Sequence, residues 1–219
     1  MCADATSAGL FPSMRGDHQL PLTGYAYLRI ADHDLRQEIA KWCSKAVDEE
    51  LLAPPGPPGS EESESRTSPD EMRVTIATGV TPPALEAIHT LKDQHCPFEL
   101  QLEQIEIVEK DEGRRLDICI GVADTSALAT LRNDLAAVGV SCGDEGSSWR
   151  VVVARVQNEN ASLLHRIGEL RKDVERNKRI FLQRSCEATQ LVVVMPPAAK
   201  LSETLEITEF DLAYKGGGI

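Results

Sequence analysis

Two short segments of the chain carry residue types that could bind a phosphate group. RVTIA at residues 73–77 and RVVVA at residues 150–154 each place an arginine at the head of an apolar run that ends in alanine. A guanidinium offers paired N–H donors to phosphate oxygens, and the hydroxyl of Thr75 offers one more. A guanidinium cannot act as a general base, because its pKa lies above ~12 and it has no proton-accepting atom. These residue types therefore favour anion binding over proton transfer.

The elements that must position these residues follow from the hydrophobic pattern. Both segments are predicted to be strands, because branched apolar residues dominate them. Between them the pattern predicts a helix, a long strand, a strand that pairs back on it as a hairpin, and a second helix. The alternation in the long strand shifts by one between Leu102 and Ile105, which indicates a bulge or a bend. These four elements span residues 81–95, 97–109, 115–123 and 125–139.

Further elements flank this central series. A first strand is expected at residues 22–32. Asp32 or Asp34 can then cap a helix, and the helical spacing continues to about Leu52. The fold class is therefore α+β, with two similar lobes of antiparallel sheet that carry helices on their outer faces. After the second Arg-headed strand the pattern predicts a helix and two strands, at residues 160–178, 190–195 and 203–214.

Residues 22–214 are expected to form one bilobal domain between two flexible tails, at residues 1–21 and 215–219. Within this domain, residues 53–70 are rich in Pro, Gly, Ser and Glu and contain no apolar residue after Ala53. A segment of this composition buries too little apolar surface to fold, so we expect a disordered insert or a long loop. The alternative is a regulated, phosphorylatable segment, because its serines have acidic or proline neighbours.

Composition excludes several classes of protein. The net charge is −12, so neither nonspecific nucleic-acid binding nor a DNA partner is expected. No apolar run is long enough to span a membrane, and the first residues lack a secretion signal, so we expect an intracellular protein, in the cytoplasm rather than in the nucleus or an organelle, which stay open as alternatives. The six cysteines form no Cys-x-x-Cys pair, and the five histidines show no ligand spacing. Free thiols are therefore expected, without a metal site or a cofactor.

Each of the two predicted Arg-headed strands ends in a short sequence motif. The first reads RVTIATG over residues 73–79 and is followed by a predicted helix, and the second ends in Ala154-Arg155-Val156. Together with the order of elements, these motifs resemble the 2H phosphoesterase superfamily, which contains RNA 2′,5′-ligase-like proteins and cyclic nucleotide phosphodiesterases. The resemblance covers about residues 22–156. It implies two lobes that face each other across a central cleft.

The resemblance also implies a pair of catalytic histidines, one at the head of each strand, acting as general base and general acid on a 2′,3′-cyclic phosphate or related ester. This chain has Arg73 and Arg150 at those positions. The family's hydroxyl residues two positions later bind phosphate oxygens; Thr75 is kept here, whereas Val152 cannot donate. The four positions would then form a phosphate clamp that has lost catalysis. The alternative is that both arginines point outward and pair with acidic side chains.

A predicted helix near the C-terminus is the only locally basic element. It suits an amphipathic helix whose charges pair along its own surface, and it has no interleaved aromatic residues for base stacking. The alternative is a face for RNA phosphate or for an acidic partner protein. The basic residues of this candidate face are Arg166, Arg171, Lys172, Arg176, Lys178 and Arg179.

Three functions remain open from the sequence. The first is a catalytically degenerate 2H-like protein, without enzymatic activity, that binds a nucleotide, an RNA end or a protein partner. The second is an active 2′,3′-cyclic phosphodiesterase or RNA 2′,5′-phosphodiesterase, which would need a different acid–base pair. The third is a structural scaffold subunit of a larger assembly, which the acidic charge and the aromatic content of 4% fit equally well.

Overall fold

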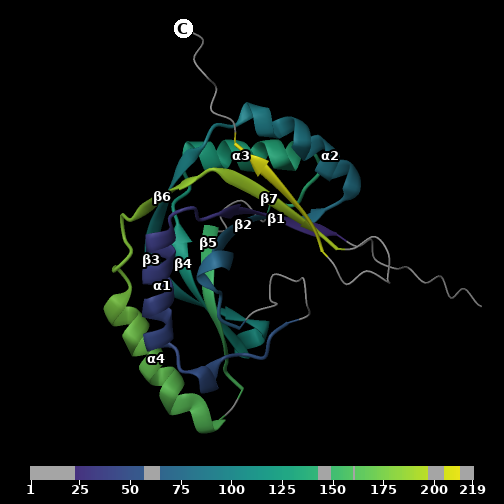
Figure 1. Ribbon diagram of the computed structural model, residues 1–219. Coiled ribbons are helices and arrows are strands. Elements are labelled where there is room, and N and C mark those ends of the chain that lie inside the picture. Colours follow the sequence, from purple (N-terminus) through teal and green to yellow (C-terminus); the bar gives the residue numbers. More distant parts are fainter. Residues whose placement is uncertain (1–22, 57–64, 143–148, 160, 197–204, 213–219) are drawn as a thin grey trace, which may run out of the picture.

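The computed structural model describes residues 23–56, 65–142, 149–159, 161–196 and 205–212. These residues form an antiparallel sheet flanked by helices, which confirms the predicted α+β class (Figure 1). The strands are β1 Gly24–Arg29, β2 Arg73–Val80, β3 Phe98–Lys110, β4 Arg115–Val122, β5 Trp149–Gln157, β6 Ser185–Ala188, β7 Gln190–Met195 and β8 Glu206–Asp211. The helices are α1 His33–Ala46, α2 Pro82–Leu91, α3 Ser126–Ala137 and α4 Leu164–Asn177.

The sheet consists of two halves that meet at a short junction between β5 and β2. The strand order is β6-β3-β4-β5 in one half and β2-β1-β7-β8 in the other. Across the junction, Val74 and Val151 are the only Cα partners within the described residues. By contrast, β4 and β5 pair along their whole length. The two predicted lobes are therefore halves of one continuous sheet.

The helices tie the two halves together, because the chain crosses between them. α1 follows β1 but packs against β5 and α4, and α3 follows β4 but packs against β2. α4 packs on β3, and His89 of α2 sets its ring edge-on to Phe210 of β8 at a centroid distance of 5.5 Å. As a result, α1 and α4 lie beside one half of the sheet and α2 and α3 beside the other (Figure 1). None of the described helices has the length and apolar character needed to cross a membrane.

The two faces of the sheet differ in what covers them. The main core cluster contains Leu28 of β1 together with buried residues from all of α1, α2, α3 and α4. Tyr27 neighbours Leu28 in the strand and so points to the opposite face. It belongs to a small separate cluster with Val192 and Val194, and no residue of that cluster comes from a helix. We call this side of the sheet the helix-free face.

Local signals in the sequence explain where two of the helices begin. The side chain of Asp32 accepts a hydrogen bond from the N–H of Leu35 at 2.9 Å, and Thr125 accepts one from the N–H of Leu128 at 3.3 Å. Each bond satisfies a donor that the first helical turn would leave unpaired. Gly139 follows α3 with a φ of 84°, a conformation that glycine adopts without strain.

The two described ends of the segment 53–70, which was expected to be a disordered insert or a long loop, pair with β5. The N–H of Ala53 donates to the carbonyl of Arg155 at 2.8 Å, and the N–H of Arg155 donates to the carbonyl of Ser65 at 2.7 Å. The physical reason is that β2 leaves β5 after the junction, so the free backbone groups of β5 pair with these residues instead. Residues 57–64 lie outside the described part of the chain.

Tertiary contacts also move several predicted boundaries. The helix expected to continue to Leu52 ends at Ala46 and is followed by a 3₁₀ turn. Strand β6 was not predicted, because its four residues are ordered by pairing with the start of β3. The predicted shift in the long strand is confirmed as a register irregularity between Leu102 and Ile105.

The burial of Leu28 on the face of the sheet that the helices cover can be tested by measuring the stability of a substituted protein. Leu28 is 0% exposed, and Leu28→Ala should lower the free energy of unfolding by about 2–5 kcal/mol, because the shortened side chain leaves a cavity. Ile207, which is 58% exposed, provides the control, and Ile207→Ala should change the same quantity by no more than about 0.5 kcal/mol. Urea unfolding followed by circular dichroism measures both. Equal losses would contradict the assignment of the core.

Candidate anion-binding site

The residues proposed as a phosphate clamp lie together on the helix-free face. Val74 and Val151 are cross-strand partners buried in the main core. Side chains alternate along a strand, so the residues on either side of each valine point to the other face. In an antiparallel pair with this register, Arg73 lies opposite Val152, and Thr75 lies opposite Arg150. These four residues, called the quartet below, are Arg73, Thr75, Arg150 and Val152.

The guanidinium of Arg73 lies against two tyrosine rings of β1. Its central carbon is 5.2 Å from the ring centroid of Tyr25 and 4.9 Å from that of Tyr27. Cation–π contacts of this kind hold the guanidinium by its flat face and leave its N–H edges for hydrogen bonds. Within the described residues, Arg73 has no carboxylate partner. It is therefore a positioned cation available to an anion.

Arg150 is held differently, because it forms an ion pair with Glu106 of β3. Its Nε donates to Oε1 of Glu106. The two side chains are 32% and 30% exposed, so the pair is partly shielded from water. Pairing with an acidic side chain, the alternative drawn from the sequence, thus applies to Arg150, whereas Arg73 has no such partner among the described residues.

No imidazole takes part in the quartet. Neither β2 nor β5 contains a histidine. Nε2 of His95 lies 3.0 Å from Oδ2 of Asp134, and His89 packs on Phe210. The other histidines in the described part of the chain are on α1 and α4. The strands that hold the quartet therefore lack a side chain with a pKa suited to proton transfer near neutral pH.

Solved structures with the same architecture identify the fold. A crystal structure described as a phosphoesterase has a TM-score of 0.54 and 14% identity, covering 89% of this chain and 99% of that chain. Escherichia coli LigT complexed with 3′-AMP has a TM-score of 0.51 and 14% identity, covering 86% and 94%. Kluyveromyces marxianus Usb1 has a TM-score of 0.52 and 13% identity, covering 87% and 98%. This chain has the 2H phosphoesterase fold. No protein-family model matches the chain, and no curated protein sequence matches it.

Within the 2H phosphoesterase fold, the quartet occupies the two central strands at the junction of the halves. Arg73 and Arg150 stand at the positions that the sequence resemblance assigns to the two histidines. Identities of 13–14% show the shared fold and assign no role to any residue. The chemistry of the quartet must therefore be argued from its own side chains.

Cys119 of β4 places a thiol beside the quartet. It is the cross-strand partner of Val152 on one side and of Glu106 on the other, and it is 1% exposed. Burial, together with the negative charge of Asp117, raises the pKa of this thiol to about 12. A thiol with this pKa stays protonated at neutral pH and is a poor nucleophile. Cys119 therefore packs beside the quartet without offering covalent catalysis.

The quartet has neighbours that the sequence pattern did not reveal. Alternation along a strand places Tyr25 and Tyr27 on one face of β1, but it could not show that Arg73 lies over them. Glu106 and Arg150 are 44 residues apart, and no motif connects them. Only the register of β3, β4 and β5 could have found that ion pair.

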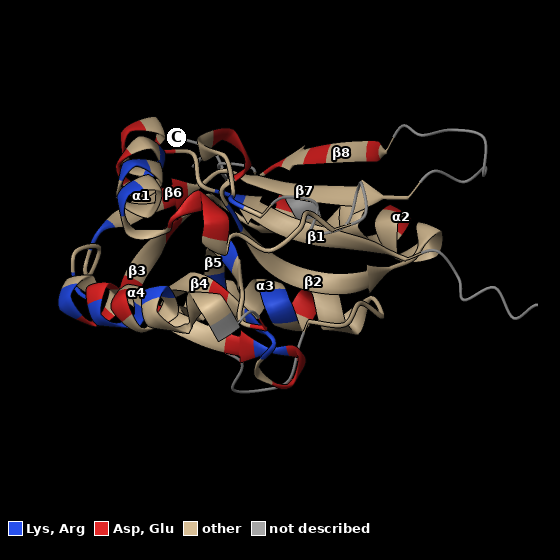
Figure 2. Ribbon diagram, turned by 90° about the horizontal axis from the view of Figure 1, so that it is seen from below, with Lys and Arg blue, Asp and Glu red and all other residues tan. Residues whose placement is uncertain are grey.

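The basic residues of α4 and of the two positions after it, Lys178 and Arg179, are largely neutralised by neighbouring carboxylates. Within the helix, Lys172 pairs with Glu169 at 2.9 Å and Arg176 with Asp173 at 3.2 Å. Similar partners are Glu50 for Arg166, Glu109 for Arg171 and Glu175 for Lys178, while Arg179 has none among the described residues. Acidic and basic residues accordingly lie side by side on α4 (Figure 2). This arrangement weakens the case for an RNA-binding face.

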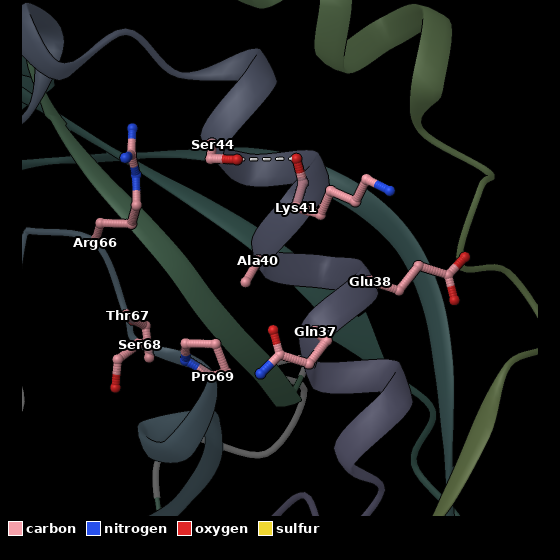
Figure 3. Close-up of a pocket in the computed structure, with 9 residues that line it drawn as sticks. All are labelled: Gln37, Glu38, Ala40, Lys41, Ser44, Arg66, Thr67, Ser68 and Pro69. Atoms are coloured by element: carbon pink, nitrogen blue, oxygen red, sulfur yellow. Dashed lines mark hydrogen bonds between the residues drawn. The ribbon is translucent and has the colours of Figure 1, made fainter.

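An open hollow of about 860 Å³ lies apart from the quartet, between α1 and residues 66–69 (Figure 3). Arg66 in its wall donates from Nη2 to the carbonyl of Val47 at 2.6 Å, so this cation is already bound to the protein. The side chains of Glu38 and Lys41 point away from residues 66–69. Its two cations, Lys41 and Arg66, therefore do not converge on the hollow, and the quartet is the stronger candidate. Its lining residues are Gln37, Glu38, Ala40, Lys41, Ser44, Arg66, Thr67, Ser68 and Pro69.

The contrast between two cysteines tests the environment of the quartet. In the folded protein at pH 8, a maleimide should modify the exposed Cys96 and leave Cys119 unmodified, because the latter thiol is buried and has a pKa of about 12. Both should react once the chain is unfolded in guanidinium chloride. Peptide mass mapping measures the modification at each site. Rapid native labelling of Cys119 would show that it lies in open solvent.

Proposed function

We propose that this protein binds a phosphate-bearing ligand, a nucleotide or an RNA end, on the helix-free face and does not hydrolyse it. The observation that carries this proposal is the composition of the quartet, in which two arginines and a hydroxyl meet without an imidazole. Guanidinium and hydroxyl groups donate hydrogen bonds to phosphate oxygens, and charge-assisted bonds are about twice as strong as neutral ones. The site is therefore suited to holding an anion.

Arg73 makes the largest contribution to binding in this proposal. Its flat face rests on Tyr25 and Tyr27, so little further ordering is needed when a phosphate accepts from its N–H groups. Among the described residues, no carboxylate is paired with Arg73 and so none would compete with a bound phosphate for its N–H groups. Thr75 lies two residues away on the same face and supplies a hydroxyl donor.

Nucleotides are proposed as the ligand class because of what is bound in similar structures. Escherichia coli LigT has been solved with 3′-AMP and with NADP⁺, and Kluyveromyces marxianus Usb1 with uridine monophosphate. A phosphate attached to a nucleoside is common to these compounds. The same chemistry fits a site that combines a guanidinium with two tyrosine rings.

Hydrolysis by the mechanism of the 2H family needs a base and an acid of suitable pKa. Such positioned proton transfer contributes roughly 10²–10⁴-fold to a rate. The quartet offers guanidinium groups, a chemical group that does not act as a base, and the Cys119 thiol beside them has a pKa raised to about 12. Binding can therefore persist where this catalytic route cannot operate.

Replacing Arg73 should separate specific binding from general attraction to positive charge. Arg73→Ala should weaken the Kd for 3′-AMP by about 10- to 100-fold, the effect of losing a charge-assisted hydrogen bond worth about 1.5–3 kcal/mol. Arg171→Ala removes the same charge from α4, away from the quartet, and should leave the Kd unchanged within about twofold. Isothermal titration calorimetry measures both. Equal losses in the two variants would refute a specific site.

Incubation with 2′,3′-cyclic AMP tests the absence of catalysis. No turnover above the buffer rate is expected by chromatography of the products, because the proton-transfer pair is missing. Turnover that disappears in Arg73→Ala would instead establish an active phosphodiesterase. If neither 3′-AMP nor 2′,3′-cyclic AMP binds, the scaffold hypothesis becomes the better account of the protein.

A further inference from the structure

The turn that follows α4 carries two large apolar side chains at the surface. Ile180 and Leu182 are each 43% exposed, whereas Phe181 between them is 1% exposed and belongs to the main core. The ring of Phe181 meets that of Trp42 of α1 edge-on, at a centroid distance of 6.1 Å. This contact anchors one residue of the turn and leaves its two neighbours outside. The turn, residues 178–184, joins α4 to β6 at the outer rim of the molecule (Figure 1).

Backbone hydrogen bonds hold this turn on the irregular part of β3. The N–H of Leu102 donates to the carbonyl of Arg184 at 2.7 Å, and the N–H of Ile105 donates to the carbonyl of Lys178 at 2.8 Å. These two donors lie on either side of the register irregularity in β3. The turn is thus preformed, so little conformational entropy is lost when a partner covers its apolar side chains.

Cations lie beside the apolar pair, and two of them have no carboxylate partner within the described residues. Arg179 directly precedes Ile180, and Lys41 of α1 is the second. Figure 3 shows Lys41 on the same side of α1 as Glu38, which pairs with Arg184 of the turn at 3.0 Å. Lys41 therefore lies on the side of α1 that faces the turn.

Projecting apolar side chains beside unpaired cations suit the surface of a membrane that contains anionic lipids. At such a surface, apolar side chains enter the boundary between headgroups and acyl chains, and Lys and Arg are attracted by the negative headgroups. A contact of this kind needs no helix that crosses the bilayer. Nucleic acid would leave the aliphatic pair in water, because its bases stack on aromatic rings, and a peptide helix binds in a groove rather than on a projecting turn.

The net charge of the protein, −12, opposes this approach only at long range. At physiological ionic strength the Debye length is about 8 Å, so charges elsewhere on the molecule are largely screened from the turn. The side chains of the turn and of the adjoining side of α1 therefore decide the contact.

We propose that the turn 178–184 is a contact site for membranes that contain anionic lipids. Ile180 and Leu182 enter the interface, while Arg179 and Lys41 lie at the level of the lipid phosphates. The anchor of the turn, Phe181, belongs to the main core, on the opposite face of the sheet from the quartet. The contact therefore leaves the helix-free face accessible and does not depend on the proposed function.

Sedimentation with lipid vesicles tests the proposal on the full chain. The protein should partition at least about tenfold more strongly onto vesicles of phosphatidylcholine with phosphatidylserine than onto vesicles of phosphatidylcholine alone, the scale set by two attracted cations. The double variant Ile180→Asp with Leu182→Asp should lose about tenfold or more of the partition onto the mixed vesicles, because the pair then carries charges that the headgroups repel. Arg179→Ala should lose about fivefold.

Matched variants elsewhere in the chain separate the turn from a general effect of charge or exposure. Ile207 of β8 is 58% exposed, and Ile207→Asp should change the partition by no more than about twofold, because the new charge is screened from the turn. Arg171 of α4 pairs with Glu109, and Arg171→Ala should likewise have an effect of about twofold or less. Circular dichroism establishes that each variant is folded before its partition is compared.

The outcomes distinguish a membrane contact from other uses of the turn. Equal partition onto both kinds of vesicle, partition that the double variant keeps, or a protein that stays in solution with every vesicle would each overturn the proposal. Self-association without vesicles that is lost in the double variant would show that the turn binds a second copy of the chain instead. None of these outcomes bears on the binding of 3′-AMP to the quartet.

Discussion

The junction between β2 and β5 is the constraint on which the arrangement of this protein depends. Val74 and Val151 pair there in the main core, and their burial determines that the residues on either side of each valine face the other side of the sheet. A slip of one residue would turn Arg73 and Arg150 into the apolar core, where an unpaired guanidinium is very costly. The hydrophobic effect on one face thus determines which polar side chains meet on the other.

The helices reinforce this asymmetry. Each contributes its buried residues to the main core, so they leave the opposite face to side chains of the strands. The two halves of the sheet pair directly over a short distance only. Helices that follow a strand of one half and pack against the other half, such as α3 between β4 and β2, hold the halves together. The short junction also frees part of the edge of β5, which the ends of the segment 53–70 then occupy. The fold and the candidate site therefore both depend on the difference between the face of the sheet that the helices cover and the helix-free face.

Several of the described cations are paired with acidic side chains, in agreement with the net charge of −12. Arg29 pairs with Glu209 at 2.7 Å, Arg150 pairs with Glu106, and the cations of α4 mostly have acidic neighbours. Arg73 departs from this pattern, because its neighbours are tyrosine rings. A cation held by aromatic faces keeps its hydrogen-bonding capacity, whereas one held by a carboxylate has already used part of it. This difference is why Arg73 has the central place in the proposed function.

Residue types and strand periodicity were fixed by the sequence alone. They gave the α+β class, the order of the central elements, Asp32 or Asp34 as the cap of the first helix and the absence of histidine at both motif positions, because each of these depends on neighbours close in the chain. Tertiary structure decided what lies beside each functional residue. The period of two assigns a face, but the partner across a sheet depends on register between strands far apart in sequence, as for Glu106 and Arg150. For the same reason the ordered ends of the segment 53–70 and strand β6 could not be foreseen, since both are stabilised by partners and not by their own composition.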